Sequence, residues 1–128
     1  MIYLDTSVAL AHVLAEDRAA PDVLWHETLV SSRLLEYEMW TRIHARGLGN
    51  SHGNEARALI GRVGLIELAP PVLTRALEPF PVAVRTLDAL HLASIEFLRS
   101  RRQTPRLASF DERLLAAAQA LHIPVYEM

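Results

Sequence analysis

Short apolar runs alternate along the chain with longer stretches in which apolar residues recur at helical spacing. Residues 1–4 are apolar at every position, which is typical of a strand buried on both faces. Further short runs predict strands at residues 28–32, 64–71, 106–110 and 123–128. The pattern therefore predicts five short strands spread along the chain.

The longer stretches between these strands predict helices. Residues 33–47 and 86–102 give the clearest patterns, because good helix formers fill both stretches and Gly47 supplies a carboxyl-terminal stop to the first. Other helical segments are predicted at residues 6–17, 21–27, 54–63 and 111–122, with a helical turn and a loop over 72–81. The glycine- and asparagine-rich segment 47–54 predicts a loop.

Strands that alternate with helices are typical of right-handed βαβ units around a parallel sheet. The sequence therefore predicts an α/β fold, with a central parallel sheet of four to five short strands flanked by helices. No linker or repeat divides residues 1–128, which we interpret as a single domain. In such a fold we expect the functional site beyond the carboxyl ends of the strands.

Composition excludes several classes of protein. The absence of cysteine rules out disulfides, thiolate metal sites and cysteine nucleophiles. No apolar run approaches the ~20 residues of a membrane span, and the amino terminus does not resemble a signal peptide, so we expect a cytoplasmic protein without a membrane role. The net charge of −2 does not indicate nucleic-acid binding, although all 13 basic residues are arginine.

Three of the five aspartates lie where a helix is predicted to begin. Asp5 ends the first strand, Asp111 follows the strand at 106–110, and Asp88 lies in the first turn of helix 86–102. Each could simply cap or stabilise a helix amino terminus. Hydroxyl neighbours could take over that role: Thr6 and Ser7 for Asp5, Thr86 for Asp88, and Ser109, in a capping-box pair with Glu112, for Asp111.

The same three aspartates are expected to meet, because the carboxyl ends of parallel strands share one edge of the sheet. Several carboxylates in a small space repel one another unless protons or cations neutralise them. Hard divalent cations such as Mg²⁺ and Mn²⁺ prefer oxygen ligands, and Mg²⁺ commonly combines one or two carboxylates with water and substrate phosphates. The placement of the aspartates therefore favours metal-assisted phosphate chemistry.

Helix 33–47 adds Glu36 and Glu38, whose positions point about 200° apart and cannot both face the site. Glu38 has Arg42 at i+4, so an ion pair on the helix surface is the alternative interpretation. Periodicity does not choose between the two glutamates. His91 shares a helix face with Asp88 and is interpreted as a structural histidine that could lie near the site.

Four segments together resemble the PIN-domain ribonucleases, and specifically the VapC-type toxins. They are YLDTS, SSRLLEYEMWTRI, RTLDALHLASIEFL and LASFDERLLAAAQALHIPV, and the resemblance spans essentially the whole chain. It implies four acidic site residues, which are Asp5, Glu38, Asp88 and Asp111, with Glu36 in reserve. Ser109 stands where many relatives carry threonine, a change that keeps the hydroxyl.

The resemblance implies an Mg²⁺- or Mn²⁺-dependent endoribonuclease. Asp5 and Asp88 would anchor a metal, while Glu38 and Asp111 would hold a second metal or orient the attacking water. We expect Arg42 and Arg46, on the helix of Glu38, to contact RNA. The family also implies a homodimer and a cognate antitoxin that blocks the site.

Other interpretations have discriminating features. A haloacid-dehalogenase-type phosphatase needs a second acidic residue two positions after Asp5 and a downstream lysine, and the chain has Ser7 and no lysine. A non-catalytic PIN module that binds RNA or an antitoxin would lack a carboxylate, and all four positions are acidic. An RNA-processing PIN nuclease without a toxin role stays open.

Overall fold

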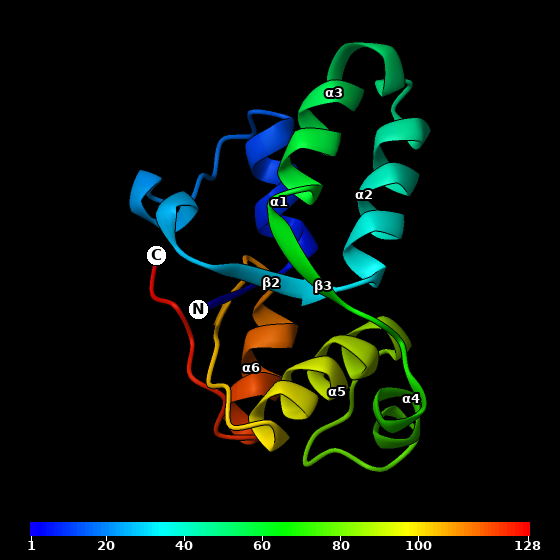
Figure 1. Cartoon of the computed structure of the whole chain (residues 1–128), viewed down its shortest axis with the longest axis vertical. Helices are drawn as coiled ribbons and strands as arrows, with labels where there is room; N and C mark the ends of the chain where they lie inside the picture. The colour runs from blue at the N-terminus through cyan, green and yellow to red at the C-terminus, as the bar shows by residue number, and fades with distance from the viewer.

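The computed structural model describes all residues from 1 to 128, and a sheet of four parallel strands lies at its centre (Figure 1). The strands are β1 (Ile2–Leu4), β2 (Leu29–Ser32), β3 (Val63–Ile66) and β4 (Arg106–Ala108), in the spatial order β3-β2-β1-β4. In β1, Tyr3 is paired with Val30 of β2 and Leu107 of β4. The predicted α/β class and parallel sheet are confirmed.

Helices cover both faces of the sheet (Figure 1). One face carries α1 (Thr6–Val13), α2 (Leu34–Ala45), α3 (Gly49–Ile60) and the 3₁₀ helix η1 (Asp22–His26). The other carries α4 (Pro70–Ala76), α5 (Thr86–Ser100) and α6 (Glu112–Ala120). No helix is long and apolar enough to cross a membrane.

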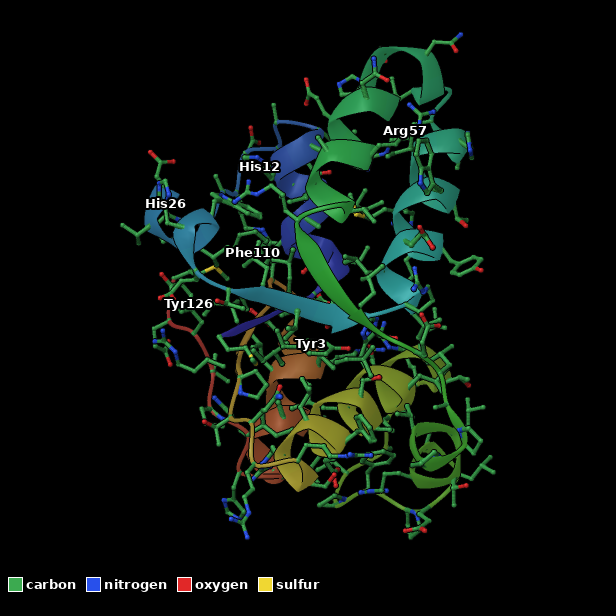
Figure 2. The ribbon with its side chains drawn as sticks, in the orientation of Figure 1. Tyr3, His12, His26, Arg57, Phe110 and Tyr126 are labelled. Carbon is green, nitrogen blue, oxygen red and sulfur yellow. The ribbon has the colours of Figure 1, made fainter.

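The first strand is apolar throughout because each of its faces contributes to a different core. Ile2 and Leu4 pack into the core beneath α1, α2 and α3. Tyr3 points to the opposite side and joins the core formed with α5 and α6 (Figure 2). Strand β1 therefore lies between two helical layers, as expected for a central parallel strand.

The predicted loop at 47–54 is wrong over most of its length, because α3 begins at Gly49. Gly47 does end α2, with φ of +67°. The turn after it is short because α3, which carries Arg57 (Figure 2), packs back against α2. Arg57 lies over the ring of Trp40, and a side chain at Gly53 would meet the same ring. Packing here overrides the low helix propensity of the segment.

The predicted terminal strand 123–128 is also wrong, because only one bridge forms, between Leu107 and Val125. Pro124 has no N–H to donate, which interrupts the ladder beside β4. The strand expected over 64–71 ends at Ile66, and Pro70 begins α4. Proline is favoured in the first turn of a helix, where its missing N–H costs nothing.

Candidate active site

A cleft of about 700 Å³ opens where β1 and β4 end. Five carboxylates line it: the four predicted ones, Asp5, Glu38, Asp88 and Asp111, which come from four different segments, and Glu16. Four arginines line the same cleft, namely Arg18, Arg42, Arg46 and Arg85. The structure thus brings the four predicted acidic residues together, and Glu36 is not among the residues that line the cleft.

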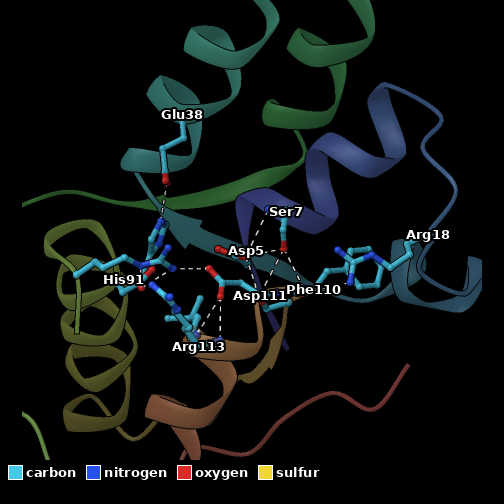
Figure 3. Close-up of polar contacts among 12 residues, drawn as sticks. Asp5, Ser7, Arg18, Glu38, His91, Phe110, Asp111 and Arg113 are labelled. Atoms are coloured by element: carbon cyan, nitrogen blue, oxygen red, sulfur yellow. Dashed lines mark hydrogen bonds and ion pairs between the residues drawn. The ribbon is translucent and has the colours of Figure 1, made fainter. Parts of the chain in front are cut away.

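Asp5 follows β1 and is buried, and two hydroxyls hold one of its oxygens (Figure 3). Its Oδ2 accepts hydrogen bonds from Ser7 Oγ at 2.6 Å and from Ser109 Oγ at 2.8 Å. These hydroxyls in turn accept hydrogen bonds from the N–H groups of Phe110 and Asp111. These hydrogen bonds connect the end of β1 to the turn after β4. The other carboxylate oxygen, Asp5 Oδ1, has no hydrogen-bond partner.

Asp5 and Asp111 themselves cap helices, although the sequence also offered hydroxyl neighbours for that role. Asp111 Oδ1 accepts hydrogen bonds from the N–H groups of Arg113 and Leu114, so the predicted capping box does not form. Asp5 Oδ2 accepts a long 3.4 Å bond from Ser7 N at the start of α1. Thr86 does not cap α5. Capping uses one oxygen of each aspartate, so it does not prevent the other from facing the cleft.

Asp88 and Asp111 are joined by the guanidinium of Arg85, which sequence reasoning did not identify. Arg85 Nη2 lies 2.8 Å from Asp88 Oδ2 and 2.7 Å from Asp111 Oδ2. The i,i+3 spacing in the sequence predicts the contact with Asp88, but only the tertiary fold brings Asp111 to the same guanidinium.

The two aspartates have opposite pKa shifts. Burial raises the pKa of Asp88, and the charges of Asp111 and Asp5 raise it further, which outweighs the opposing effect of Arg85. Burial also raises the pKa of Asp111, but the N–H of Leu114, Arg85 and the N–H of Arg113 outweigh it and lower the net pKa. The unequal shifts reflect the backbone N–H groups that Asp111 alone receives.

Glu38 reaches the cleft from α2 and does not pair with Arg42. Its Oε1 accepts a hydrogen bond from Thr6 Oγ1 at 3.0 Å and lies 2.6 Å from His91 Nε2 (Figure 3). Glu36 is more exposed and pairs with Arg33 at 3.4 Å, a partner that our sequence analysis missed. The geometry therefore places Glu38, not Glu36, beside the other carboxylates.

His91 is a buried histidine that connects Glu38 to the core. Its Nδ1 lies 2.8 Å from the hydroxyl of Tyr3. Because the carboxylate can only accept, Nε2 must carry the proton in the contact with Glu38. Burial lowers the pKa of His91, but the hydrogen bond and charge of Glu38 raise it more, with further increases from Asp5 and Asp88.

The arginines differ in how firmly they are held. Arg46 lies 3.4 Å from Glu16, while Arg42 has no ion-pair partner. Arg18 lies over the ring of Phe110, at 4.9 Å from its centroid, and no pattern in the sequence indicated it. Cations along the rim make the cleft suitable for an anionic ligand.

The carboxylates also suit a hard divalent cation. Oxygen atoms of Asp5 and Asp88 are free of hydrogen-bond partners, and neither is closed off from solvent. No three histidine or acidic side chains converge to enclose a metal ion. Mg²⁺ usually takes only one or two carboxylates and completes its shell with water and phosphate, so these residues fit it in chemistry and number.

Comparison with known proteins identifies the class. The PIN domain family model matches residues 2–120, and the chain belongs to this family. Its relatives are ribonucleases. The chain is 33% identical over 131 residues to Ribonuclease VapC35 of Mycobacterium tuberculosis, covering 98% of this chain and 95% of that protein. It is 28% identical over 126 residues to Ribonuclease VapC47 of the same organism, covering 93% and 90%. Within the PIN-domain family, the chain groups with the VapC ribonucleases.

Proposed function

We propose that the chain is a VapC-type endoribonuclease that hydrolyses RNA phosphodiester bonds with Mg²⁺ or Mn²⁺. The observation that carries this proposal is that four predicted acidic residues from four segments line one cleft, together with Glu16 and four arginines. Carboxylates supply the oxygen ligands of a divalent cation, and arginines attract a polyanion. The names of the relatives support RNA as that polyanion.

Asp5 and Asp88 are the residues that would hold the cation, because each has an oxygen without a partner beside the other carboxylates. A divalent cation, when bound, stabilises charge on a phosphate oxygen and lowers the pKa of a bound water. Ser7 and Ser109 keep Asp5 in one orientation through hydrogen bonds to Oδ2. The protein thus fixes the ligand geometry through contacts outside the ligand set.

Glu38 would orient the attacking water and accept its proton. Thr6 and His91 hold its Oε1, so its second oxygen can face the water. Asp111, which caps α6 and binds Arg85, would hold the opposite wall of the cleft in place. In-line attack requires that the water and phosphate be positioned on one axis, and rigid carboxylates on two walls suit that requirement.

The arginines of the cleft would bind the phosphates on either side of the scissile bond. Arg42 is the strongest candidate, since no acidic partner holds it. Arg46 would have to leave Glu16, which is a weak and exposed pair. Guanidinium groups contact phosphates and bases of unstacked RNA, so single-stranded or looped RNA is the expected substrate.

We further propose that the chain acts in the cytoplasm as the toxin of a VapBC-type pair, restrained by a cognate antitoxin. Induced expression without a partner should then arrest bacterial growth, and co-expression of the antitoxin should restore it. Active enzyme that leaves growth unchanged would instead favour an RNA-processing PIN nuclease. Protein that binds RNA without cleaving it would favour a non-catalytic module.

The two glutamates of α2 give a matched test of the site. Glu38→Gln should lower the rate of RNA cleavage by about 100- to 10,000-fold, as expected for loss of a general base. Glu36→Gln changes the same residue type on the same helix outside the cleft and should leave the rate within about twofold. Equal losses in both variants would contradict the role of Glu38, as measured on one labelled RNA in Mg²⁺.

The homodimer implied by the resemblance remains a prediction, and we propose that a second copy of the chain covers the apolar groove beside α4 and α5. Leu77 is 88% exposed at this groove, and most of its lining is hydrophobic. Leu77→Glu should convert the dimer to a monomer in light scattering. Val23→Glu, at an exposed apolar residue on η1, should leave it a dimer.

A further inference from the structure

Arg85 occupies a bridging position between two carboxylates of the cleft. Its Nη2 lies 2.8 Å from Asp88 Oδ2 and 2.7 Å from Asp111 Oδ2, and its Nε donates to the same Asp88 oxygen at 2.9 Å. The two aspartates come from different elements, the first turn of α5 and the turn before α6. One nitrogen thus contacts carboxylates from two different elements and neutralises charge on both.

The oxygens of the three cleft aspartates fall into two groups. Asp5 Oδ1 and Asp88 Oδ1 have no partner and are not closed off from solvent. Both oxygens of Asp111 are engaged, Oδ1 by the N–H groups of α6 and Oδ2 by Arg85. The side of the cleft at Asp5 is therefore open to a cation, while the side at Asp111 already contains a positive charge.

A divalent cation cannot share the gap between Asp88 and Asp111 with this guanidinium. Mg²⁺ binds carboxylate oxygens at 2.0–2.1 Å, much closer than the Arg85 contacts, so binding there would require Arg85 to leave. Leaving would break hydrogen bonds to both aspartates at once. A cation at Asp5 and the free oxygen of Asp88 would break none.

We propose that Arg85 takes the place of a second metal, so that the site binds one divalent cation per chain, at Asp5 and Asp88. This inference rests on the proposed function for the presence of a cation, and it goes further by fixing the number of cations. It also gives Asp111 a separate role: the residue holds Arg85 against the cleft and binds no metal itself. The guanidinium remains available to stabilise charge on the phosphate from the Asp111 side.

The test is the stoichiometry of Mn²⁺ binding, measured by calorimetry and by electron paramagnetic resonance without RNA. The wild-type chain should bind one Mn²⁺ with an isolated-ion spectrum. Arg85→Met should bind a second Mn²⁺, and a coupled spectrum should appear, because two metals in one such site lie only about 3.5–4 Å apart. Arg42→Met removes an arginine from the same cleft, away from the aspartate pair, and should still bind one.

The outcomes separate the two proposals. Two coupled Mn²⁺ ions in the wild type, or a single Mn²⁺ of unchanged affinity in Arg85→Met, would overturn the inference about Arg85 while the metal site stands. Absence of Mn²⁺ binding in every variant would overturn both proposals. Two Mn²⁺ ions in the wild type would overturn the inference whether or not Arg85→Met folds, and circular dichroism checks that Arg85→Met is folded before its stoichiometry is compared. Arg85→Lys, which keeps the charge, should bind one Mn²⁺.

Discussion

Asp5 and Asp111 each divide their two oxygens between the fold and the cleft. One oxygen of each residue accepts a backbone N–H at a helix start, and the hydroxyls of Ser7 and Ser109 strengthen this arrangement at Asp5. The remaining oxygen faces the cleft side, free in Asp5 and bound to Arg85 in Asp111. The choice between cap and ligand, posed by the sequence, is therefore not exclusive.

Ser109 is the residue on which this arrangement depends most. Its buried hydroxyl donates to Asp5 and accepts from the N–H of Asp111. Ser109→Ala should lower the free energy of unfolding by about 1–3 kcal/mol, because it leaves buried polar groups without a partner. Ser100→Ala, at an exposed serine, should change it by less than about 0.5 kcal/mol. Urea denaturation measures both, and equal effects would contradict the role of Ser109.

His91 makes metal-free stability depend on pH. Its pKa is raised in the folded protein, so the folded chain holds this proton more tightly than the unfolded chain does. The resulting stability is fully present below the unfolded pKa of about 6.5 and is lost as pH rises through the folded value. In EDTA, the melting temperature should therefore fall from pH 6 to pH 9.

His91→Gln should flatten this fall in the melting temperature, whereas His26→Gln, at an exposed histidine, should not. Differential scanning fluorimetry across the pH range compares the two variants with the wild type. The same pH dependence in His91→Gln as in the wild type would show that another group is responsible.

Two kinds of element were predictable from the sequence. They are the strand that is buried on both faces and the helices with a clear helical period. Strand β1 and helices α2 and α5 lie where the pattern predicted them. Helix α3 was missed at its start, because its early turns are stabilised by Trp40 and Arg57 across the α2–α3 interface and not by propensity. Contacts between elements leave no pattern in the sequence of either element that would predict them.

The end of α2 supplies a test of backbone conformation. Gly47 has φ of +67° and open space around the position where a side chain would start. Gly47→Ala should therefore destabilise the chain by about 1 kcal/mol through backbone strain alone. Gly64→Ala, in β3, meets only ordinary contacts and carries no positive φ, so it should not show this loss. Chemical denaturation distinguishes the two, and equal stabilities would contradict the assigned strain.

The candidate site was also predictable only where a local sequence pattern marks its residues. Asp5, Asp88 and Asp111 are marked by their places at strand and helix ends, and the resemblance added Glu38. Arg18 carried no such mark, and the spacing of Arg85 indicated only Asp88; the contacts of Arg85 with Asp111 and of Arg18 with Phe110 join residues 26 and 92 positions apart. Their roles follow from the tertiary fold alone.

At the scale of the whole molecule, the location of the charged residues indicates the site, and the net charge does not. The net charge is only −2, yet four of the 13 basic residues line a cleft that also contains five carboxylates. The helices on the two faces of the sheet supply opposite walls of this cleft: Glu38 comes from α2, and Asp88 comes from α5. The parallel topology thus brings the acidic and basic side chains of the proposed site to one cleft.

The most direct test of this account is RNA cleavage by purified protein in Mg²⁺, in EDTA and with the Asp5→Asn variant. The wild type should cleave in Mg²⁺ and stop in EDTA. Asp5→Asn should lower the rate by at least about 100-fold in Mg²⁺ while it keeps the circular dichroism spectrum of the folded chain, because it removes a metal ligand but retains an acceptor for Ser7 and Ser109. Cleavage that persists in EDTA, or full activity in a folded Asp5→Asn variant, would contradict a metal-dependent site in this cleft.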